Sequence, residues 1–185
     1  MLIVVPASIE AVKIITPKSF HDARGVFCET YNRNRFFEHG IELYFVQDNQ
    51  SSSAGIGTIR GLHFQSSPAA QAKIVRVLRG STFNVAVDLR RGSPTYGKWV
   101  AETLSANDGK QLLVPVGFAH GFCTLEPDTH VFYKVTAHYS AADDLGVAWN
   151  DPDLAINWPV PAGKAIVSEK DMRHPRLNSL PAYFE

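Results

Sequence analysis

Short stretches with the pattern of β-strands recur along this chain up to residue 136. They alternate between apolar and polar residues or are rich in β-branched residues. About ten are expected, over residues 12–16, 26–31, 41–50, 57–64, 73–80, 82–89, 98–104, 111–115, 121–125 and 130–136. Turn signals such as Asn107-Asp108-Gly109 separate them. Such a series predicts a β-sandwich or jelly-roll barrel rather than a parallel α/β sheet.

Only one segment before residue 136 has the pattern of a helix. It covers residues 34–39, with Asn32 or Asn34 as the N-terminal cap and Gly40 as the stop. From Ala141 onward the chain has a loop-like pattern with several prolines, so we expect it to wrap around the barrel. No internal repeat or linker divides the sequence, which predicts a single domain over residues 1–185.

The charge balance narrows the classes of partner. Eighteen basic and eighteen acidic side chains cancel, so no overall field would attract nucleic acid or an anionic membrane. An anionic ligand would need a local cluster of Arg and Lys. The apolar N-terminus is too short for a signal sequence, and no apolar run reaches the roughly 18 residues of a membrane span. These features predict a cytoplasmic protein.

One segment resembles a motif of the cupin superfamily of small jelly-roll barrels. Between Gly109 and His120 the spacing is G-x5-P-x-G-x2-H, which is similar to the second cupin motif. The first cupin motif would supply two histidines and a carboxylate, but here His63 is followed by Gln65, and the next charged residue is Lys73. An ammonium group disfavours a bound cation, so we expect no metal. The side chains themselves would then carry out acid–base chemistry.

The segment Arg60-Gly61-Leu62-His63-Phe64-Gln65 holds the main candidate base. In a regular strand Arg60 and His63 point to opposite faces. A bulge at Gly61 would bring both into one pocket. A lone histidine in a strand is more often a core or surface residue than a catalyst, but the nearby cations and the His120 motif favour a functional His63.

Together these and further blocks resemble the dTDP-4-dehydrorhamnose 3,5-epimerase family. The matching blocks occur in family order over nearly the whole chain. They are Phe20-x-Asp22-x-Arg24-Gly25, Val46-Gln47-Asp48-Asn49, the segment from Arg60 to Gln65, Pro115 to Phe122, Tyr133-Lys134, Trp149 to Pro152, and Ser168-Glu169-Lys170-Asp171.

The resemblance implies a catalytic set of four residues. His63 would remove the proton alpha to a sugar ketone, and Asp171 would orient its ring. Lys73 would stabilise the enolate oxygen, and Tyr133 would return a proton from the opposite face. Each has a plainer interpretation when taken singly: Tyr133 as a core aromatic residue, Lys73 as a solvated cation and Asp171 as a turn cap.

The resemblance also implies binding residues and a quaternary structure. Arg60 and His120 would hold sugar and diphosphate oxygens. The further binding candidates are Arg24, Glu29, Gln47, Asp48, Asn49, Lys170 and Asp144, with Asp143 as an alternative to Asp144. The family forms homodimers in which an N-terminal strand carries Arg24 and Glu29 to the partner's site, and no cofactor is implied.

The predicted activity is therefore the conversion of dTDP-4-dehydro-6-deoxy-D-glucose to dTDP-4-dehydro-L-rhamnose by inversion at C3 and C5. Three alternatives remain at this stage. The first is an epimerase that acts on one centre or on a related dTDP-4-keto sugar of secondary metabolism. The second is a non-catalytic cupin that binds nucleotide sugars, and the third is a metal-dependent cupin.

Overall fold

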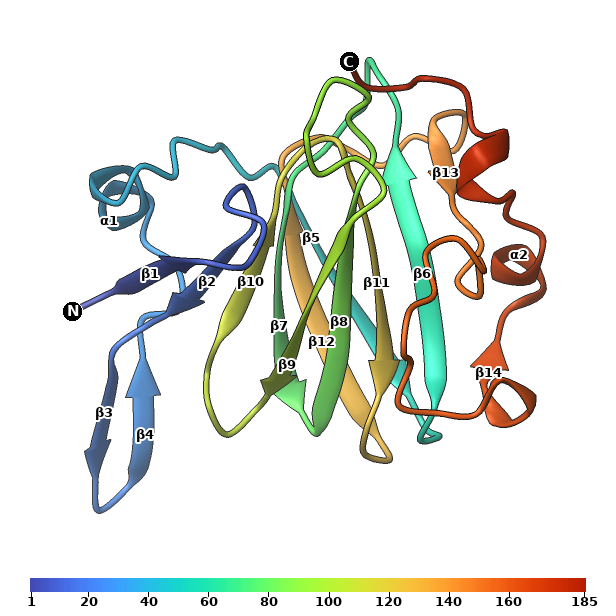
Figure 1. The fold of residues 1–185 in the computed structure, drawn as a ribbon. Helices are drawn as coiled ribbons and strands as arrows, with labels where there is room; N and C mark the ends of the chain where they lie inside the picture. Colours follow the sequence, from blue (N-terminus) through green and yellow to red (C-terminus); the bar gives the residue numbers. More distant parts are fainter.

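The computed structural model describes residues 1–185 and contains two facing, mainly antiparallel sheets (Figure 1). The first sheet has six strands. Their spatial order is β1 (Ile3–Pro6), β2 (Lys13–Thr16), β10 (Gln111–Val114), β7 (Lys73–Arg79), β12 (Thr129–Val135) and β5 (Gln47–Ser53).

The second sheet has five strands in its main path and a sixth at its side. Their spatial order is β13 (Asp144–Gly146), β6 (Thr58–Gln65), β11 (Phe118–Thr124), β8 (Ser81–Asp88) and β9 (Trp99–Ser105), while β14 (Ile166–Val167) pairs with β6 in parallel.

The main core lies between the two sheets. Val75, Leu112 and Val131 come from the first sheet, and Ala86 and Phe122 come from the second; all five are at most 5% exposed. This arrangement confirms the predicted all-β, cupin-like jelly roll. The prediction followed from alternation with period two, which places every second side chain between the sheets.

The C-terminal segment covers the outer face of the second sheet, as expected for a segment that wraps the barrel. Leu154, Leu177 and Leu180 pack with Val85 and Val87 in a second core cluster. The segment is less irregular than predicted. It also contains the short elements β13, β14, α2 (Glu169–Met172), η1 (Ala162–Lys164) and η2 (Leu177–Ser179). Because these elements have two to four residues each, they carry too little periodicity for detection in the sequence.

The expected helix is α1 (Arg33–Glu38), one residue earlier than predicted, and Asn32 is its cap. Asn32 Oδ1 accepts a hydrogen bond from the Arg35 backbone nitrogen at 3.3 Å. The strand predicted over residues 41–50 is wrong in its first half, because β5 begins only at Gln47. The alternation there arises because Ile41 and its apolar neighbours pack around α1.

A two-stranded ribbon projects away from the sandwich (Figure 1). It consists of β3 (Ser19–Asp22) and β4 (Gly25–Cys28), which pair only with each other. The strand predicted over residues 26–31 therefore ends early, and β1 and β3 were not predicted. Phe27 at the ribbon is 69% exposed. No helix in the fold combines the length and the apolar character needed to cross a membrane.

Candidate active site

A cavity of about 430 Å³ opens between the two sheets. Residues of both sheets and of the C-terminal segment line it. They are Ser51, Thr58, Ile59, Arg60, His63, Lys73, His120, Phe122, Tyr133, Ile166, Val167, Ser168 and Asp171. Six of these residues, at positions 60, 63, 73, 120, 133 and 171, are predicted site residues, so the fold gathers them from five separate elements.

A bulge in β6 places Arg60 and His63 on the same cavity. The pairing of β6 with β11 shifts register between these two residues. Gly61 lies within the shift, with φ at +139°, and a Cβ there would be 2.5 Å from the Gly121 Cα. Only glycine fits such a backbone and such a close approach. The bulge predicted at Gly61 is confirmed.

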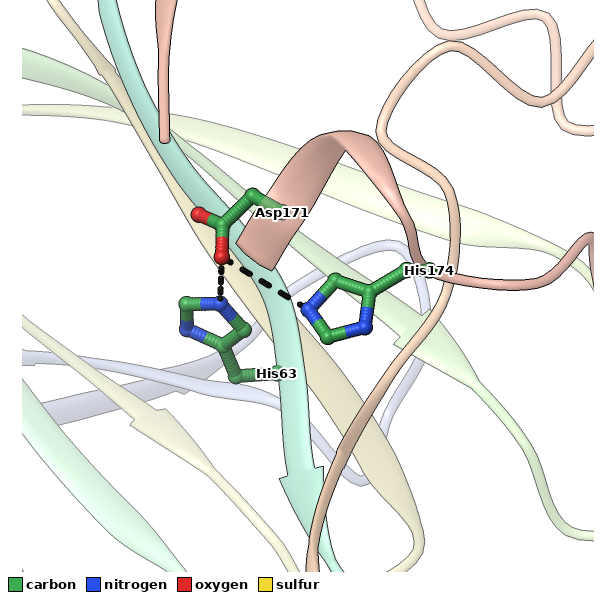
Figure 2. A group of neighbouring side chains, drawn as sticks. All are labelled: His63, Asp171 and His174. Atoms are coloured by element: carbon green, nitrogen blue, oxygen red, sulfur yellow. Dashed lines mark hydrogen bonds and ion pairs between the residues drawn. The ribbon is translucent and has the colours of Figure 1, made fainter. Parts of the chain in front are cut away.

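His63 and Asp171 form a hydrogen-bonded couple (Figure 2). His63 Nε2 lies 2.8 Å from Asp171 Oδ1, and the Gly61 N–H donates to Asp171 Oδ2 at 3.1 Å. Burial would raise the pKa of Asp171, but contacts with His174 and His63 and the Gly61 N–H outweigh it and hold the pKa well below its usual range. Asp171 is therefore a fixed anion beside the His63 ring.

Lys73 reaches the same cavity from β7 in the opposite sheet. Its ammonium group lies 3.5 Å from the His63 carbonyl oxygen. Burial lowers the pKa of Lys73 to about 8, and the Asp144 carboxylate opposes this shift. Lys73 thus remains a cation near neutral pH but is costly to keep charged, which suits a group that stabilises a developing negative charge.

Tyr133 enters the cavity from β12, also in the first sheet. Burial raises the pKa of Tyr133, while the nearby Arg60 cation opposes the shift. The hydroxyl is therefore protonated at neutral pH and can donate a proton. His63 belongs to β6 of the second sheet, so the candidate base and the candidate acid approach the cavity from opposite sheets.

The tautomer of His120 is fixed by Asn84, a residue that the sequence analysis missed. His120 Nε2 lies 3.2 Å from Asn84 Oδ1, while Asn84 Nδ2 donates to Thr82. This orientation makes Nε2 the donor and leaves Nδ1 as an acceptor. Burial and the neighbouring Lys73 and His63 lower the pKa of His120 well below its ordinary value.

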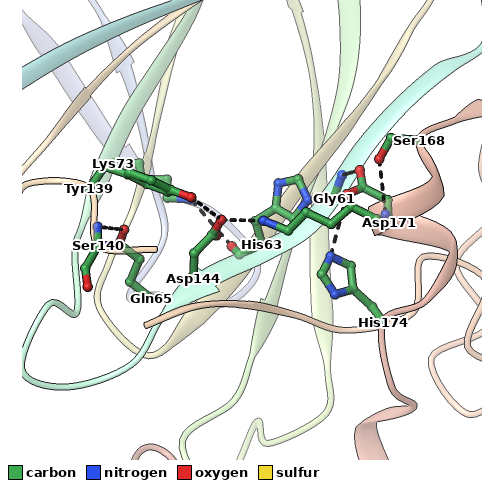
Figure 3. A network of polar contacts seen from close by, with 11 residues as sticks. Gly61, His63, Gln65, Lys73, Tyr139, Ser140, Asp144, Ser168, Asp171 and His174 are labelled. Atoms are coloured by element: carbon green, nitrogen blue, oxygen red, sulfur yellow. Dashed lines mark hydrogen bonds and ion pairs between the residues drawn. The ribbon is translucent and has the colours of Figure 1, made fainter. Parts of the chain in front are cut away.

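Asp144, and not Asp143, belongs to the polar network beside the cavity (Figure 3). Asp144 accepts a hydrogen bond from the Tyr139 hydroxyl at 3.2 Å and forms a close ion pair with Lys170. Asp143 instead accepts from the Ser140 hydroxyl and thus fixes a local turn. This places Asp144, rather than Asp143, in contact with another predicted binding residue, Lys170, and its role in binding a ligand stays a prediction.

Three predicted binding residues of β5 do not line the cavity. Gln47 contacts Asn49 at 2.8 Å and accepts from the Tyr139 backbone nitrogen at 3.0 Å. Asp48 is exposed and pairs with Lys134. Gln47 therefore connects β5 to the Tyr139 segment, whereas Asp48 faces the other way along the alternating strand.

Arg24 and Glu29 also lie apart from the cavity of their own chain. Arg24 follows β3, and its side chain is 90% exposed and pairs with Asp22. Glu29 follows β4 and pairs with Arg35 at 3.1 Å. In Figure 1 the β3–β4 ribbon and the elements β6 and α2 lie at opposite sides of the molecule. Within one chain these two residues cannot contribute to the site.

His174 is a second residue that the sequence analysis missed. It follows Asp171 by three positions, the spacing of one helical turn, and that spacing was the available signal. His63, Asp171 and His174 offer three potential metal ligands within 4.8 Å of one another. These side chains fit a metal poorly. His63 and Asp171 are hydrogen-bonded to each other, which occupies the atoms that would bind the ion. The Lys73 ammonium group beside His63 would repel a cation.

A jelly-roll barrel whose cavity holds a histidine–aspartate couple and a facing tyrosine defines an acid–base enzyme of the cupin type. A sequence model described as dTDP-4-dehydrorhamnose 3,5-epimerase matches residues 6–179. This chain belongs to that family, and the resemblance inferred from its motifs is confirmed.

Relatives of known sequence and structure are similar to this chain over almost its full length. The dTDP-4-dehydrorhamnose 3,5-epimerase of Sinorhizobium fredii is 53% identical over 178 residues, which cover 96% of this chain and 91% of the relative. The Bacillus anthracis enzyme with TDP and PPi bound has a TM-score of 0.92 and 49% identity, covering 95% of this chain and 99% of that one. The Legionella pneumophila enzyme in complex with dTDP-4-keto-L-rhamnose has a TM-score of 0.93 and 42% identity, covering 98% and 96%.

Proposed function

We propose that this protein converts dTDP-4-dehydro-6-deoxy-D-glucose to dTDP-4-dehydro-L-rhamnose by inverting C3 and C5. The observation that carries the proposal is the placement of His63 and Tyr133 on opposite sheets around one cavity. Inversion requires a proton to leave one face of a carbon and another to arrive at the opposite face. Two proton-transfer groups on opposite walls meet that requirement.

The chemistry follows from the charges of the site. The His63 imidazole takes the proton alpha to the C4 ketone, and the Asp171 carboxylate stabilises the resulting imidazolium. The electron pair of the broken C–H bond moves into an enolate, whose oxygen Lys73 stabilises. Tyr133 then gives its hydroxyl proton to the carbon from the other face. Solvent reprotonates the tyrosinate and takes the proton from His63.

Substrate recognition is divided between neutral and charged groups. Because His120 is neutral and its Nδ1 is an acceptor, it suits a sugar hydroxyl better than a diphosphate oxygen. Arg60 and Lys170 are cations at or beside the cavity and suit the diphosphate. Asp144 holds Lys170 until the ligand arrives.

The proposal includes assembly of the protein as a homodimer. The β3–β4 ribbon exposes Phe20, Val26 and Phe27, an apolar surface that a second copy would cover. In such a dimer Arg24 and Glu29 would reach the partner's cavity. Gln47 and Asn49 share one face of β5 and would contact the nucleotide, whereas Asp48 lies on the other face, where it pairs with Lys134. The cytoplasmic location expected from the sequence is part of the same proposal.

Incubation with dTDP-4-keto-6-deoxyglucose in deuterated water tests the function. We expect deuterium at both C3 and C5 and formation of the L-rhamno product. Deuterium at one carbon alone would assign a single-centre epimerase. No exchange at either carbon, with the substrate bound, would assign the non-catalytic alternative and contradict the proposal.

The same experiment on His63→Ala identifies the base. Exchange at both carbons should fall by roughly 10²-fold or more, the usual contribution of a positioned general base. Matched thermal unfolding of the variant and the wild type controls for folding. Exchange at wild-type rate in a folded variant would remove His63 from its proposed role.

A further inference from the structure

His174 shares a carboxylate oxygen with the proposed catalytic base (Figure 2). Its Nε2 lies 3.6 Å from Asp171 Oδ1, the same oxygen that contacts His63 at 2.8 Å. The two imidazole rings are edge to face, with centroids 5.5 Å apart. Asp171 is therefore flanked by two histidines, of which only His63 lines the cavity.

The surroundings of His174 leave its ring little freedom. A Cβ at Gly146 would lie 2.5 Å from His174 Nε2, and Gly146 on β13 pairs in register with His63 on β6. Only a glycine at position 146 leaves room for the ring. The side chain is 9% exposed, and Nε2 is buried with no hydrogen-bond partner within 3.5 Å.

A buried polar atom without a partner is costly unless a nearby charge compensates it. The only anion facing His174 Nε2 within 4 Å is Asp171. An Nε2–H bond directed at the carboxylate is attractive, whereas an Nε2 lone pair directed at it would be repulsive. The geometry thus favours the tautomer with the proton on Nε2.

We infer that His174 is a positioning residue that restrains the Asp171 side chain and reduces the stabilisation that Asp171 gives to protonated His63. This inference rests on the proposed function of His63 as the base. Two N–H groups face the same Asp171 oxygen, one within hydrogen-bond distance and one at 3.6 Å. Each stabilises part of the negative charge of this oxygen, so the His63 N–H is held less strongly than it would be without His174. Without His174, Asp171 would stabilise protonated His63 more, and the base would become free only at higher pH.

Other charged and titratable groups lie around the cavity that His63 lines and remain unchanged in the test. They are Arg60 on the same strand, Lys73 on β7, His120 on β11, Tyr133 on β12, Asp144 on β13 and Lys170 on α2. None of them contacts Asp171 through a hydrogen bond. A change at His174 therefore acts on His63 through Asp171 and through the edge-to-face contact of the two rings.

Two substitutions of similar size separate the effect of the His174 N–H group from the effect of the packing of its ring. His174→Gln keeps an N–H group near the position of Nε2, and His174→Met removes it. In His174→Met we expect kcat to fall about 5- to 10-fold and the acidic limb of the pH–rate profile to move up by about half a pH unit. In His174→Gln we expect kcat and the position of the acidic limb to be close to those of the wild type. Arg173→Ala, on the exposed side of the same segment, is the control and should match the wild type.

Equal profiles in the Met variant and the wild type would overturn the inference, and so would equal defects in the Met and Gln variants. NMR of the ¹⁵N-labelled wild type gives a readout that needs neither a variant nor activity. We expect the proton of neutral His174 on Nε2 and a change in its ring signals as His63 titrates. A proton on Nδ1 would overturn the inference even if the enzyme is active, whereas inactivity with the proton on Nε2 would contradict only the proposed function.

Discussion

The backbone nitrogen of Gly61 lies 3.1 Å from Asp171 Oδ2, so the bulge in β6 and the partner of the proposed base are joined by one hydrogen bond. A regular strand would direct this N–H into the sheet ladder. The bulge frees it for a residue 110 positions later in the chain. The same backbone distortion therefore places Arg60 beside His63 and anchors the carboxylate that orients His63.

Gly61→Ala should damage both stability and activity. The new Cβ would lie 2.5 Å from the Gly121 Cα, and φ of +139° is strained for alanine. We expect the free energy of unfolding to fall by about 2 kcal/mol or more, as measured by urea denaturation. Gly163→Ala is the matched control, because nothing lies within 4 Å of its Cβ position. Equal stability of the two variants would contradict this account of the bulge.

Asp171→Asn should keep the fold but slow the reaction. The amide retains the size of the carboxylate but loses the charge that stabilises protonated His63. By analogy with other histidine–aspartate couples, we expect kcat to fall roughly 10²- to 10⁴-fold. Steady-state kinetics with circular dichroism measure both effects. Asp128→Asn, at an exposed surface ion pair, should behave as the wild type. Near-normal turnover of folded Asp171→Asn would make Asp171 a turn residue.

Tyr133→Phe should separate proton removal from inversion. The ring and its packing remain, and only the hydroxyl is lost, so stability should change little. His63 should still remove protons, giving deuterium at C3 or C5 of unreacted substrate in deuterated water. The inverted product should fall by roughly 10²-fold or more, because no acid remains on the opposite wall. Inversion at the wild-type rate would show that another group is the acid.

The pH dependence of kcat/KM should have a basic limb set by Lys73. Burial lowers the pKa of Lys73 to about 8, so its cation is present below that pH and is lost as the pH rises through it. The raised pKa of Tyr133 keeps that hydroxyl protonated over the same range. We expect kcat/KM to decline above about pH 8, and Lys73→Met to be slow with no such limb. If Lys73→Met kept the same basic limb, the limb would belong to another titrating group.

The β-sandwich and the strand that carries His63 were predictable from local sequence. The contact between His63 and Asp171 was not. Alternation with period two requires sheets, and Arg60-Gly61 predicts a bulge because glycine alone tolerates one at low cost. Asp171 was linked to His63 only through the resemblance to a family. No periodic pattern connects β6 to a short helix 108 residues later.

The sequence by itself determined the strand pattern, the bulge and the types of side chain available for acid–base chemistry. The tertiary structure decided which of them meet. Only the folded structure shows that Asn84 contacts His120, because the two residues belong to the separate strands β8 and β11. The spacing from Asp171 to His174 was present in the sequence, but only the fold shows that both histidines flank one carboxylate oxygen. The structure likewise left Arg24 and Glu29 outside their own cavity, since the β3–β4 ribbon pairs only with itself and extends away from the sandwich.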